Sequence, residues 1–293
     1  RRSLEEGFRG LDENIRFIKK NNNDPSRRVK GAIYLHAGFT VTDDLIVKAV
    51  EEAEKYNALL AMHVEEGLID VYHSLERYGV RPVERLYKLG FLKPRTILVH
   101  VVQANMDELK LIKETGASVA HNPMSNMLNA VGVAPVPEML SLGINIGIGD
   151  DGYILDVFEN MRATYLIHKV NKRDPRVLSP VDVVKMATIN VAKMFGLNSE
   201  TGSLEKGKKA DLIIINPRML PTPLTTETVY GHIVNSVNSR DVSTVLIDGE
   251  IIMIDRKLTR VDEDKAFEEA HRVVLKLWDK LLNSGSYQLD YLK

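Results

Sequence analysis

The sequence contains no cysteine in its 293 residues. This absence excludes thiol catalysis, disulfide bridges and cysteine-type zinc sites, so any metal ion must be bound by histidine, aspartate or glutamate. An excess of one charge is also lacking, because 39 Lys and Arg stand against 40 Asp and Glu, a formal net charge of -1. Such a balance gives no overall field to attract nucleic acid or an anionic membrane, and it favours a small neutral or zwitterionic ligand.

Long hydrophobic runs are missing as well. The longest, such as residues 212–215, are far too short to cross a bilayer, and no secretory leader pattern opens the chain. We therefore expect a soluble, cytoplasmic protein without a membrane partner. The chain is long enough to bury a large core, as one α/β domain or as a large domain with a small companion. Because the first residue is Arg1 rather than methionine, we also expect the beginning of the protein to be missing.

Short apolar runs that end in polar or charged residues predict five strands. They lie at residues 32–36, 59–63, 96–100, 118–121 and 144–151. Helical patterns separate them at residues 43–56, 69–89, 106–115 and 136–142. This alternation predicts parallel strands joined by right-handed crossovers. The histidines and acids fall at the carboxyl ends of the strands, which is the functional face of a parallel α/β sheet or barrel.

The remaining segments predict elements of other kinds. The chain opens with an amphipathic helix, and Ser179 with Pro180 begins another. Residues 212–216 and 244–254 are rich in β-formers, and Asp248-Gly249 suits a tight hairpin turn. The sequence then ends in a long helix whose apolar stripe we expect to pack on the body of the protein.

Three stretches predict the chemistry: "LLAMHVEE", "TILVHVV" and "INIGIGDDGY". A divalent metal bound by imidazole and carboxylate, with a position left for water, needs groups of this kind at one strand edge. His63 and Asp151 are the candidate ligands. Asp151 could also take a proton from the activated water, while Glu66 carries a proton to a leaving amine. His100 would polarise the atom under attack.

Each of these residues also has a structural explanation. A histidine such as His63 at a strand end is more often a satisfied polar residue than a ligand. Asp151 could be a turn acid beside Gly152, and Glu66 could be a first-turn acid favoured by the helix dipole. The functional interpretation is favoured because several such coincidences fall on one face.

Other polar residues were weighed in the same way. Of the adjacent acids Asp150 and Asp151, only one should reach a metal, and Asp151 is preferred because a glycine follows it. His121 could have a catalytic role or could hold the loop that follows it, and His36 is ambiguous in the same way. His36 and Asn126 are candidates for substrate binding. The histidines within helical patterns are expected to be surface or packing residues: His73, His168 and His271.

Taken in order, these motifs resemble the metal-dependent amidohydrolase superfamily. The resemblance is carried by "HVEE", by the stretch from "LVHVVQANMDELK" through "AHNPMSNMLNAVGVAP" to "GINIGIGDDGY", by "MATINVAKMFGL" and by "TGSLEKGKKADLIIIN". The nearest branch contains cytosine deaminases, chlorohydrolases and S-adenosylhomocysteine deaminases. More narrowly, "DENIRFIKK", "NAVGVAP" and "PTPLTTETVYGHI" resemble the SsnA type of aminohydrolase, associated with selenium and purine metabolism.

The resemblance implies an α/β fold of the (β/α)8 TIM-barrel type with a small β-sandwich domain. Residues 1–200 would be strands four to eight of the barrel, 201–260 the β-sandwich, and 261–293 the C-terminal helix. It also implies one divalent metal ion, zinc or alternatively iron. The family carries an HxH pair on its first strand, and no HxH occurs in this sequence. We therefore expect strands one to three to lie in an amino-terminal segment of the same protein, acting as a partner of this chain.

Site roles also follow from the resemblance. His63 matches the metal ligand after the fifth strand and Glu66 the proton-shuttling acid. His100 matches the sixth-strand histidine that faces the substrate, and His36 a substrate-side histidine after the fourth strand. Asp151 matches the eighth-strand ligand and base, whereas Asp150 replaces the more usual threonine.

The predicted function is a metal-dependent aminohydrolase or deaminase that acts on a non-peptide C–N bond of a small, amine-bearing heterocycle. The alternative is an incomplete scaffold that binds a ligand or partner, which the missing HxH favours. A phosphoryl-transfer enzyme is a weaker third option because no phosphate loop is present. The oligomeric state is left open, with a homodimer as one option.

Overall fold

The computed structural model describes residues 3–22, 29–152, 154–217 and 222–284. The chain forms two compact units, one of Arg1–Lys208 with Arg218–Ser239 and the other of Lys209–Pro217 with Arg240–Lys293. The second unit therefore joins much of the predicted small β domain to the C-terminal helix. Of the residues that the sequence assigned to the β domain, 201–208 and 222–239 belong to the first unit.

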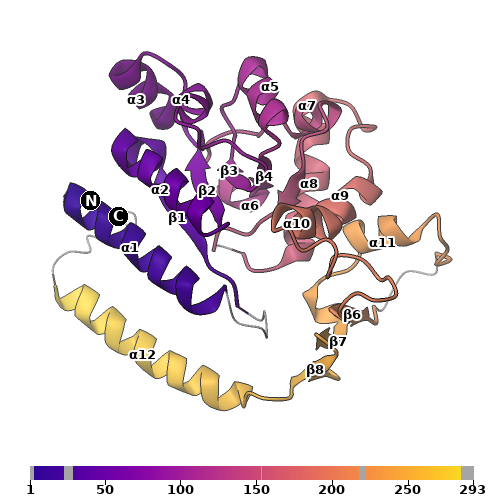
Figure 1. Cartoon of the computed structure of the whole chain (residues 1–293). Helices are drawn as coiled ribbons and strands as arrows, with labels where there is room; N and C mark the ends of the chain where they lie inside the picture. Colours follow the sequence, from indigo (N-terminus) through magenta and orange to yellow (C-terminus); the bar gives the residue numbers. More distant parts are fainter. Residues whose placement is uncertain (1–2, 23–28, 153, 218–221, 285–293) are drawn as a thin grey trace. The chain divides into compact units, whose positions relative to one another are not determined.

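A five-stranded parallel sheet forms the centre of the first unit (Figure 1). Its strands are β1 (Ala32–Ala37), β2 (Leu59–Val64), β3 (Thr96–His100), β4 (Ser118–His121) and β5 (Ile146–Ile148). Each strand pairs in parallel with the next one along the chain, in the order β1-β2-β3-β4-β5. This order confirms the predicted parallel strands and brings their carboxyl ends to one edge of the sheet.

The last of these strands is shorter than the sequence predicted. Pairing ends at Ile148, so Asp150 and Asp151 lie in a turn rather than in a strand. The φ angles of Asp151 and Gly152 are 56° and 79°, in the left-handed region that extended strands do not use. The prediction of a strand to residue 151 was wrong for this reason.

Helices of the first unit flank the sheet (Figure 1). They are α1 (Leu4–Asn21), η1 (Gly38–Thr40), α2 (Asp43–Lys55), α3 (Leu68–Tyr78), α4 (Pro82–Lys88), α5 (Met106–Thr115), α6 (Pro123–Leu128), α7 (Val136–Ser141), α8 (Val157–Lys172), α9 (Pro180–Ala187), α10 (Ile189–Met194) and α11 (Val229–Asn235). The single helix predicted over 69–89 is two helices. Gly79, with φ of 69°, ends α3 in a left-handed cap, and Pro82 begins α4.

The two glycines of "IGIGD", residues 146–150, let other segments approach β5 closely. A Cβ atom on Gly147 would lie 2.8 Å from the methyl group of Met194, which α10 packs against the strand. A Cβ on Gly149 would lie 2.3 Å from Oδ1 of Asn122. Because neither space admits a larger side chain, these glycines set the path of the chain into the turn at Asp151.

The second unit contains one four-stranded antiparallel sheet in the order β6-β7-β8-β9, where the sequence predicted a β-sandwich. Its strands are β6 (Leu212–Ile215), β7 (Val242–Ile247), β8 (Glu250–Ile254) and β9 (Lys257–Leu258). The hairpin predicted at Asp248-Gly249 is present, with φ angles of 52° and 80° at the two turn residues.

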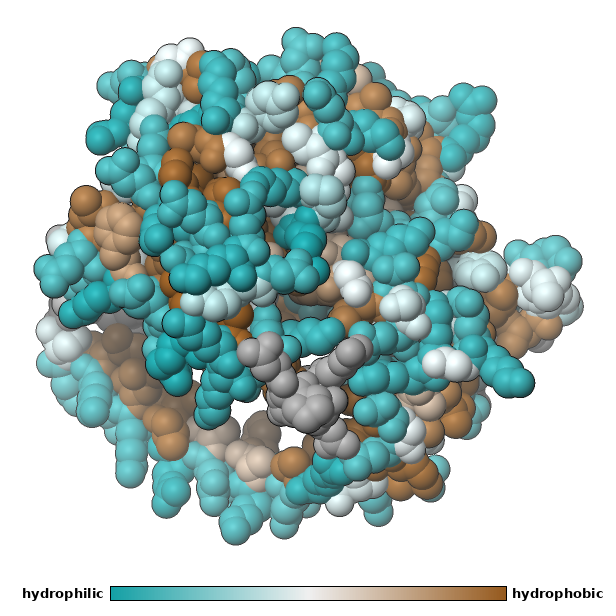
Figure 2. All heavy atoms as spheres, viewed as in Figure 1, coloured by the Kyte–Doolittle hydropathy of each residue, from teal (hydrophilic) through white to brown (hydrophobic). Residues whose placement is uncertain are grey.

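The C-terminal helix α12 (Glu263–Asn283) is amphipathic but exposed. Along it, hydrophobic side chains lie on one side and hydrophilic ones on the other (Figure 2). None of its residues is buried, and its packing on the body of the protein stays a prediction. No helix in the described part of the chain has the length and apolar composition to span a membrane.

Candidate metal centre

Three strand ends bring together a histidine pair and a carboxylate. Ligand atoms of His63 on β2, His100 at the end of β3 and Asp151 after β5 all lie within 4.8 Å of one another. Among the described residues, this is the one group of three or more histidines and acids with such spacing. The sequence predicted the meeting of His63 and Asp151, and the structure adds His100 to the group of atoms within reach of one cation.

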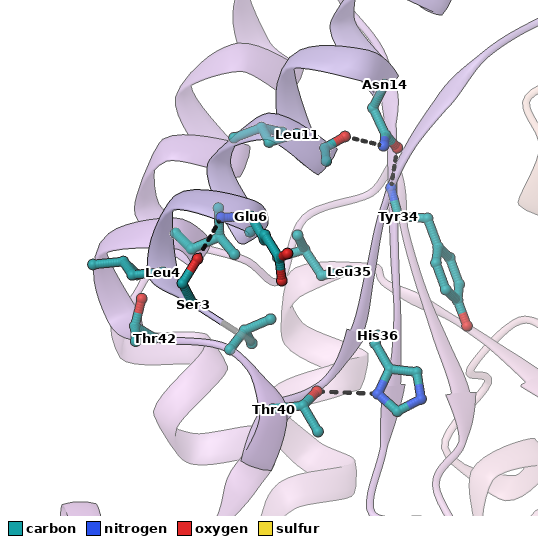
Figure 3. A pocket seen from close by; sticks show the side chains of 14 residues that line it. Ser3, Leu4, Glu6, Leu11, Asn14, Tyr34, Leu35, His36, Thr40 and Thr42 are labelled. Carbon is teal, nitrogen blue, oxygen red and sulfur yellow. Dashed lines mark hydrogen bonds between the residues drawn. The ribbon is translucent and has the colours of Figure 1, made fainter. Parts of the chain in front are cut away.

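His63 is oriented by the strand next to it. Its Nδ1 lies 2.6 Å from the backbone oxygen of His36, which can only accept, so Nδ1 donates this hydrogen bond. The hydroxyl of Tyr34 lies 2.9 Å from Nε2. Tyr34 and His36 lie on the same side of β1, and Leu35 between them points to the other side (Figure 3). Strand alternation therefore brings the phenol of Tyr34 to the centre, where only His36 was predicted.

His100 is fully buried, and Asn126 holds its ring through a hydrogen bond. Its Nδ1 lies 2.8 Å from Oδ1 of Asn126, while its Nε2 has no hydrogen-bond partner among the described residues. That Nε2 lies 3.6 Å from Oε2 of Glu66 and 3.8 Å from Oδ2 of Asp151. Burial lowers the pKa of His100, and the Glu66 carboxylate opposes this change. The imidazole is thus neutral near pH 7, with its lone pair turned toward the centre.

The left-handed backbone at His100 is a second sign of function. Its φ is 75°, and that of the following Val101 is 52°. Such conformations are costly for residues other than glycine and persist where the surrounding structure over-determines them. They are typical of sites that hold a side chain in one direction.

The two adjacent acids take different partners. Ser125 donates a hydrogen bond of 2.5 Å from its hydroxyl to Oδ2 of Asp151. Oδ1 of Asp150 instead accepts one of 2.9 Å from the amide of Asn160 on α8. Burial, with Asp156 as a smaller cause, raises the pKa of Asp150. Only Asp151 therefore joins the cluster.

Glu66 lies at the mouth of the centre. Its Oε1 accepts a hydrogen bond of 3.0 Å from the amide of Asn129. A cavity of about 380 Å³ opens between these groups. Its lining comes from the strand ends and from the segments that follow them: His36, Ala37, Phe39, His63, Glu66, Asp70, Asn129, Asp151 and Gly152. His36 lines this cavity and also a second hollow of about 390 Å³ between α1 and β1 (Figure 3).

A buried carboxyl group supports the segment that carries Glu66. Glu65 is fully buried, with φ of 52°. Burial, together with the neighbouring Glu108, raises its pKa to about 9. Arg81 bridges the two acids, at 3.3 Å from Glu65 and 2.5 Å from Glu108, and donates to the backbone oxygen of Gln103. The burial of Glu65 was not predicted from the sequence, which pointed only to Glu66.

The donor atoms fit a divalent metal ion. Two neutral imidazoles and one carboxylate are the ligand types that zinc and Fe(II) accept in proteins. Each imidazole has its Nδ1 fixed by an oxygen acceptor, which is the usual support of a metal-bound histidine. The buried Nε2 of His100 without a partner is a further sign that a group belongs in this space.

The other predicted residues lie around the centre. Asn126 is buried and holds His100, and it is absent from the cavity lining. His121 is buried outside the cluster, with its Nε2 3.3 Å from that of His168. His168 is therefore a packing residue, as expected. His73 contacts the ring of Phe39, and His271 is exposed on α12.

Comparison with known proteins gives a consistent result. The chain matches the amidohydrolase family over residues 5–252. It is 36% identical over 274 residues to a 5'-deoxyadenosine deaminase of Methanobrevibacter smithii, covering 91% of this chain and 62% of that protein. It is 37% identical over 284 residues to a 5-methylthioadenosine/S-adenosylhomocysteine deaminase of Carboxydothermus hydrogenoformans, covering 93% and 64%. The chain thus spans less than two thirds of these relatives.

Solved structures show the same likeness. An adenosine deaminase from Xanthomonas campestris with bound zinc superposes with a TM-score of 0.84 at 27% identity, over 89% of this chain and 60% of that one. An atrazine chlorohydrolase from Arthrobacter aurescens, complexed with zinc, superposes with a TM-score of 0.80 at 22% identity, over 92% and 60%. The second supports the fold alone.

Proposed function

Because the chain belongs to the amidohydrolase family, we propose that it carries metal-binding and proton-transfer residues of a metal-dependent deaminase of adenosine-type nucleosides. The observation that carries this proposal is the cluster of His63, His100 and Asp151 within 4.8 Å, with Glu66 beside it. The names of the relatives, deaminases of 5'-deoxyadenosine and of 5-methylthioadenosine or S-adenosylhomocysteine, support the substrate class.

His63 and Asp151 would hold the metal ion, which we propose to be zinc, with iron as the alternative. The ion, when bound, polarises water and favours its deprotonation at neutral pH. His100 would face the substrate rather than bind the metal, and the lone pair on its Nε2 would accept a hydrogen bond from the attacking water or from the substrate. His36 would contact the substrate from the opposite side of the cavity.

The protons would then pass through two carboxylates. Water adds to the ring carbon that bears the amine, and Asp151 accepts the proton that the water loses. Glu66 donates a proton to the amine nitrogen, the C–N bond breaks, and ammonia leaves with the bonding electron pair. The product keeps the oxygen of the water on the ring carbon.

The finer assignments remain proposals of the same kind. They are the SsnA type of aminohydrolase, a complete (β/α)8 barrel with a β-sandwich, the boundaries at residues 200 and 260, and a homodimer. A binding role for Asn126 is also still a proposal, although its contact with His100 favours a supporting one.

The absence of an HxH pair from this sequence supports a second candidate function. In that case the chain is part of a scaffold that binds a nucleoside without converting it. The two can be separated with protein reconstituted with zinc or with Fe(II). The panel is adenosine, 5'-deoxyadenosine, 5'-methylthioadenosine and S-adenosylhomocysteine, with ammonia release, ligand binding and metal content measured together. A deaminase releases ammonia from at least one of them. Near-stoichiometric metal and nucleoside binding without ammonia would support the scaffold instead.

Asp151→Asn should abolish ammonia release and leave the circular dichroism spectrum unchanged. Asp150→Asn is the matched control, because the neighbouring acid bonds Asn160 instead. Activity like that of the unmodified protein in Asp151→Asn would refute the assignment of this residue.

A further inference from the structure

The two oxygens of the Glu66 carboxyl group have different surroundings. Oε1 accepts the amide hydrogen bond of Asn129, at 3.0 Å. Oε2 lies 3.6 Å from Nε2 of His100, on the side of the metal centre. A carboxyl group turns freely about its last bond unless a partner fixes it, so this arrangement selects one oxygen for each side.

Asn129 is itself held by the backbone around it. It caps the end of α6, and its N–H bonds the backbone oxygen of Ser125 at 2.9 Å. Two residues later, the oxygen of Val131 accepts a hydrogen bond of 2.5 Å from the side chain of Gln103. The amide of Asn129 therefore meets Glu66 from a fixed position, rather than at the end of a free loop.

The same short helix supports three groups of the centre. Ser125 bonds Asp151, Asn126 bonds His100, and Asn129 bonds Glu66. Asn129 follows Asn126 by three residues and Ser125 by four, the two spacings that place helical side chains next to one another. The first contact holds the proposed metal ligand Asp151, the second holds His100, and the third holds the proposed proton donor.

We propose that Asn129 is a positioning residue that turns Oε2 of Glu66 toward the leaving group of the substrate. The proposal rests on the deaminase function proposed above. A neutral amide can orient the carboxyl group without adding a charge beside it. The side chain of Asn129 also lines the cavity, so it holds Glu66 at the edge of the space that the substrate would occupy.

A change of leaving group tests this role. Ammonia leaves a ring carbon only if its nitrogen is protonated, whereas chloride leaves with the bonding electron pair and needs no proton. Adenosine and its 6-chloro counterpart present these two groups at one carbon. Misplacing a proton donor should therefore slow the reaction of the 6-amino substrate and leave that of the 6-chloro substrate almost unchanged.

The variant is Asn129→Leu, which keeps the approximate size and removes the donor. We expect kcat for the 6-amino substrate to fall by about 10- to 100-fold, because a misplaced acid loses part of the roughly 100- to 10,000-fold that general acid catalysis contributes. For the 6-chloro substrate, kcat should fall by less than about threefold. Both KM values should stay within about threefold of those of the unmodified protein, because the lost interaction acts on the chemical step and not on substrate binding. Asn129→Gln, which retains the amide, should restore part of the loss.

Two controls separate this role from a structural one. Leu128→Ala changes the exposed neighbour on the same helix and should leave both reactions unchanged. The zinc content of Asn129→Leu should equal that of the unmodified protein. An equal fall of kcat for both substrates, or loss of zinc, would overturn the positioning role of Asn129 but leave the proposed deaminase function standing. Turnover of neither substrate by the unmodified, zinc-loaded protein would overturn the proposed function and this role together.

Discussion

The hydroxyl of Ser125 donates a hydrogen bond of 2.5 Å to Oδ2 of Asp151. Ser125 is fully buried on α6, and Asp151 follows β5, so the bond joins segments that are 26 residues apart. Supporting hydrogen bonds of this kind fix the direction of a ligating carboxylate.

Ser125→Ala should weaken metal binding by about 10- to 100-fold, the usual effect of losing a group that supports a ligand. Competition with a chromophoric chelator measures the affinity. Ser141→Ala is a suitable control, because the hydroxyl of that exposed serine bonds only a backbone oxygen within α7. Unchanged zinc affinity in Ser125→Ala would show that Asp151 needs no support or binds no metal.

Substitution of His100 should separate catalysis from metal binding. If His100 faces the substrate, His100→Asn should lower kcat by about 100-fold or more, as expected for loss of an electrostatic contact in the transition state. Its zinc content should remain close to that of the unmodified protein. His63→Asn, by contrast, should lose the metal. Loss of zinc from both variants would make His100 a ligand instead.

Arg85 should stabilise the segment between β1 and α2. Its guanidinium is buried, donates to Asp43 at 2.6 Å and to the oxygen of Gly38 at 2.8 Å, and lies 3.7 Å from the ring of Tyr78. Arg85→Lys should lower the free energy of unfolding by about 2–3 kcal/mol, because an ammonium group cannot replace the planar fork.

Urea denaturation measures this loss. Arg16→Lys, at an exposed pair with Glu13 on α1, should have no measurable effect and serves as the control. Equal stability of Arg85→Lys and the unmodified protein would contradict a specific role for the guanidinium.

The buried histidine His168 should make the fold sensitive to acid. Burial lowers its pKa from 6.5 to about 4, against a smaller opposing effect of Glu138. Below about pH 6.5, His168 binds a proton in the unfolded chain but stays neutral in the folded protein. The free energy of unfolding therefore falls as the pH falls from about 6.5 toward 4. At pH 5 this loss is on the order of 2 kcal/mol.

The measurement is urea unfolding at pH 7 and pH 5 after chelation of metal. His168→Gln should lose less stability between the two pH values than the unmodified protein, by roughly the same 2 kcal/mol. His121 faces His168 and also has a lowered pKa, so part of the acid sensitivity should remain in the variant. An identical pH dependence in both proteins would contradict a buried, neutral His168.

The sequence by itself determined the strands and the placement of polar residues at their ends. Apolar runs and the residues that stop them are local signals, and parallel strands must bring their carboxyl ends to one edge. His63, His100 and Asp151 could therefore be selected before any coordinates were known. Gly79 and Pro82, which divide one predicted helix into two, were equally visible in the sequence and were not used.

The tertiary structure alone decided which side chains support that centre. Glu66 and Asn129 are 63 residues apart, and no local sequence pattern around either residue predicts their hydrogen bond. Asn126 was expected at the substrate and lies behind His100 instead. Local periodicity reports which face of an element is buried. Hydrogen bonds between distant segments depend on how the elements pack, and that packing brings α6 beside the ends of β2, β3 and β5.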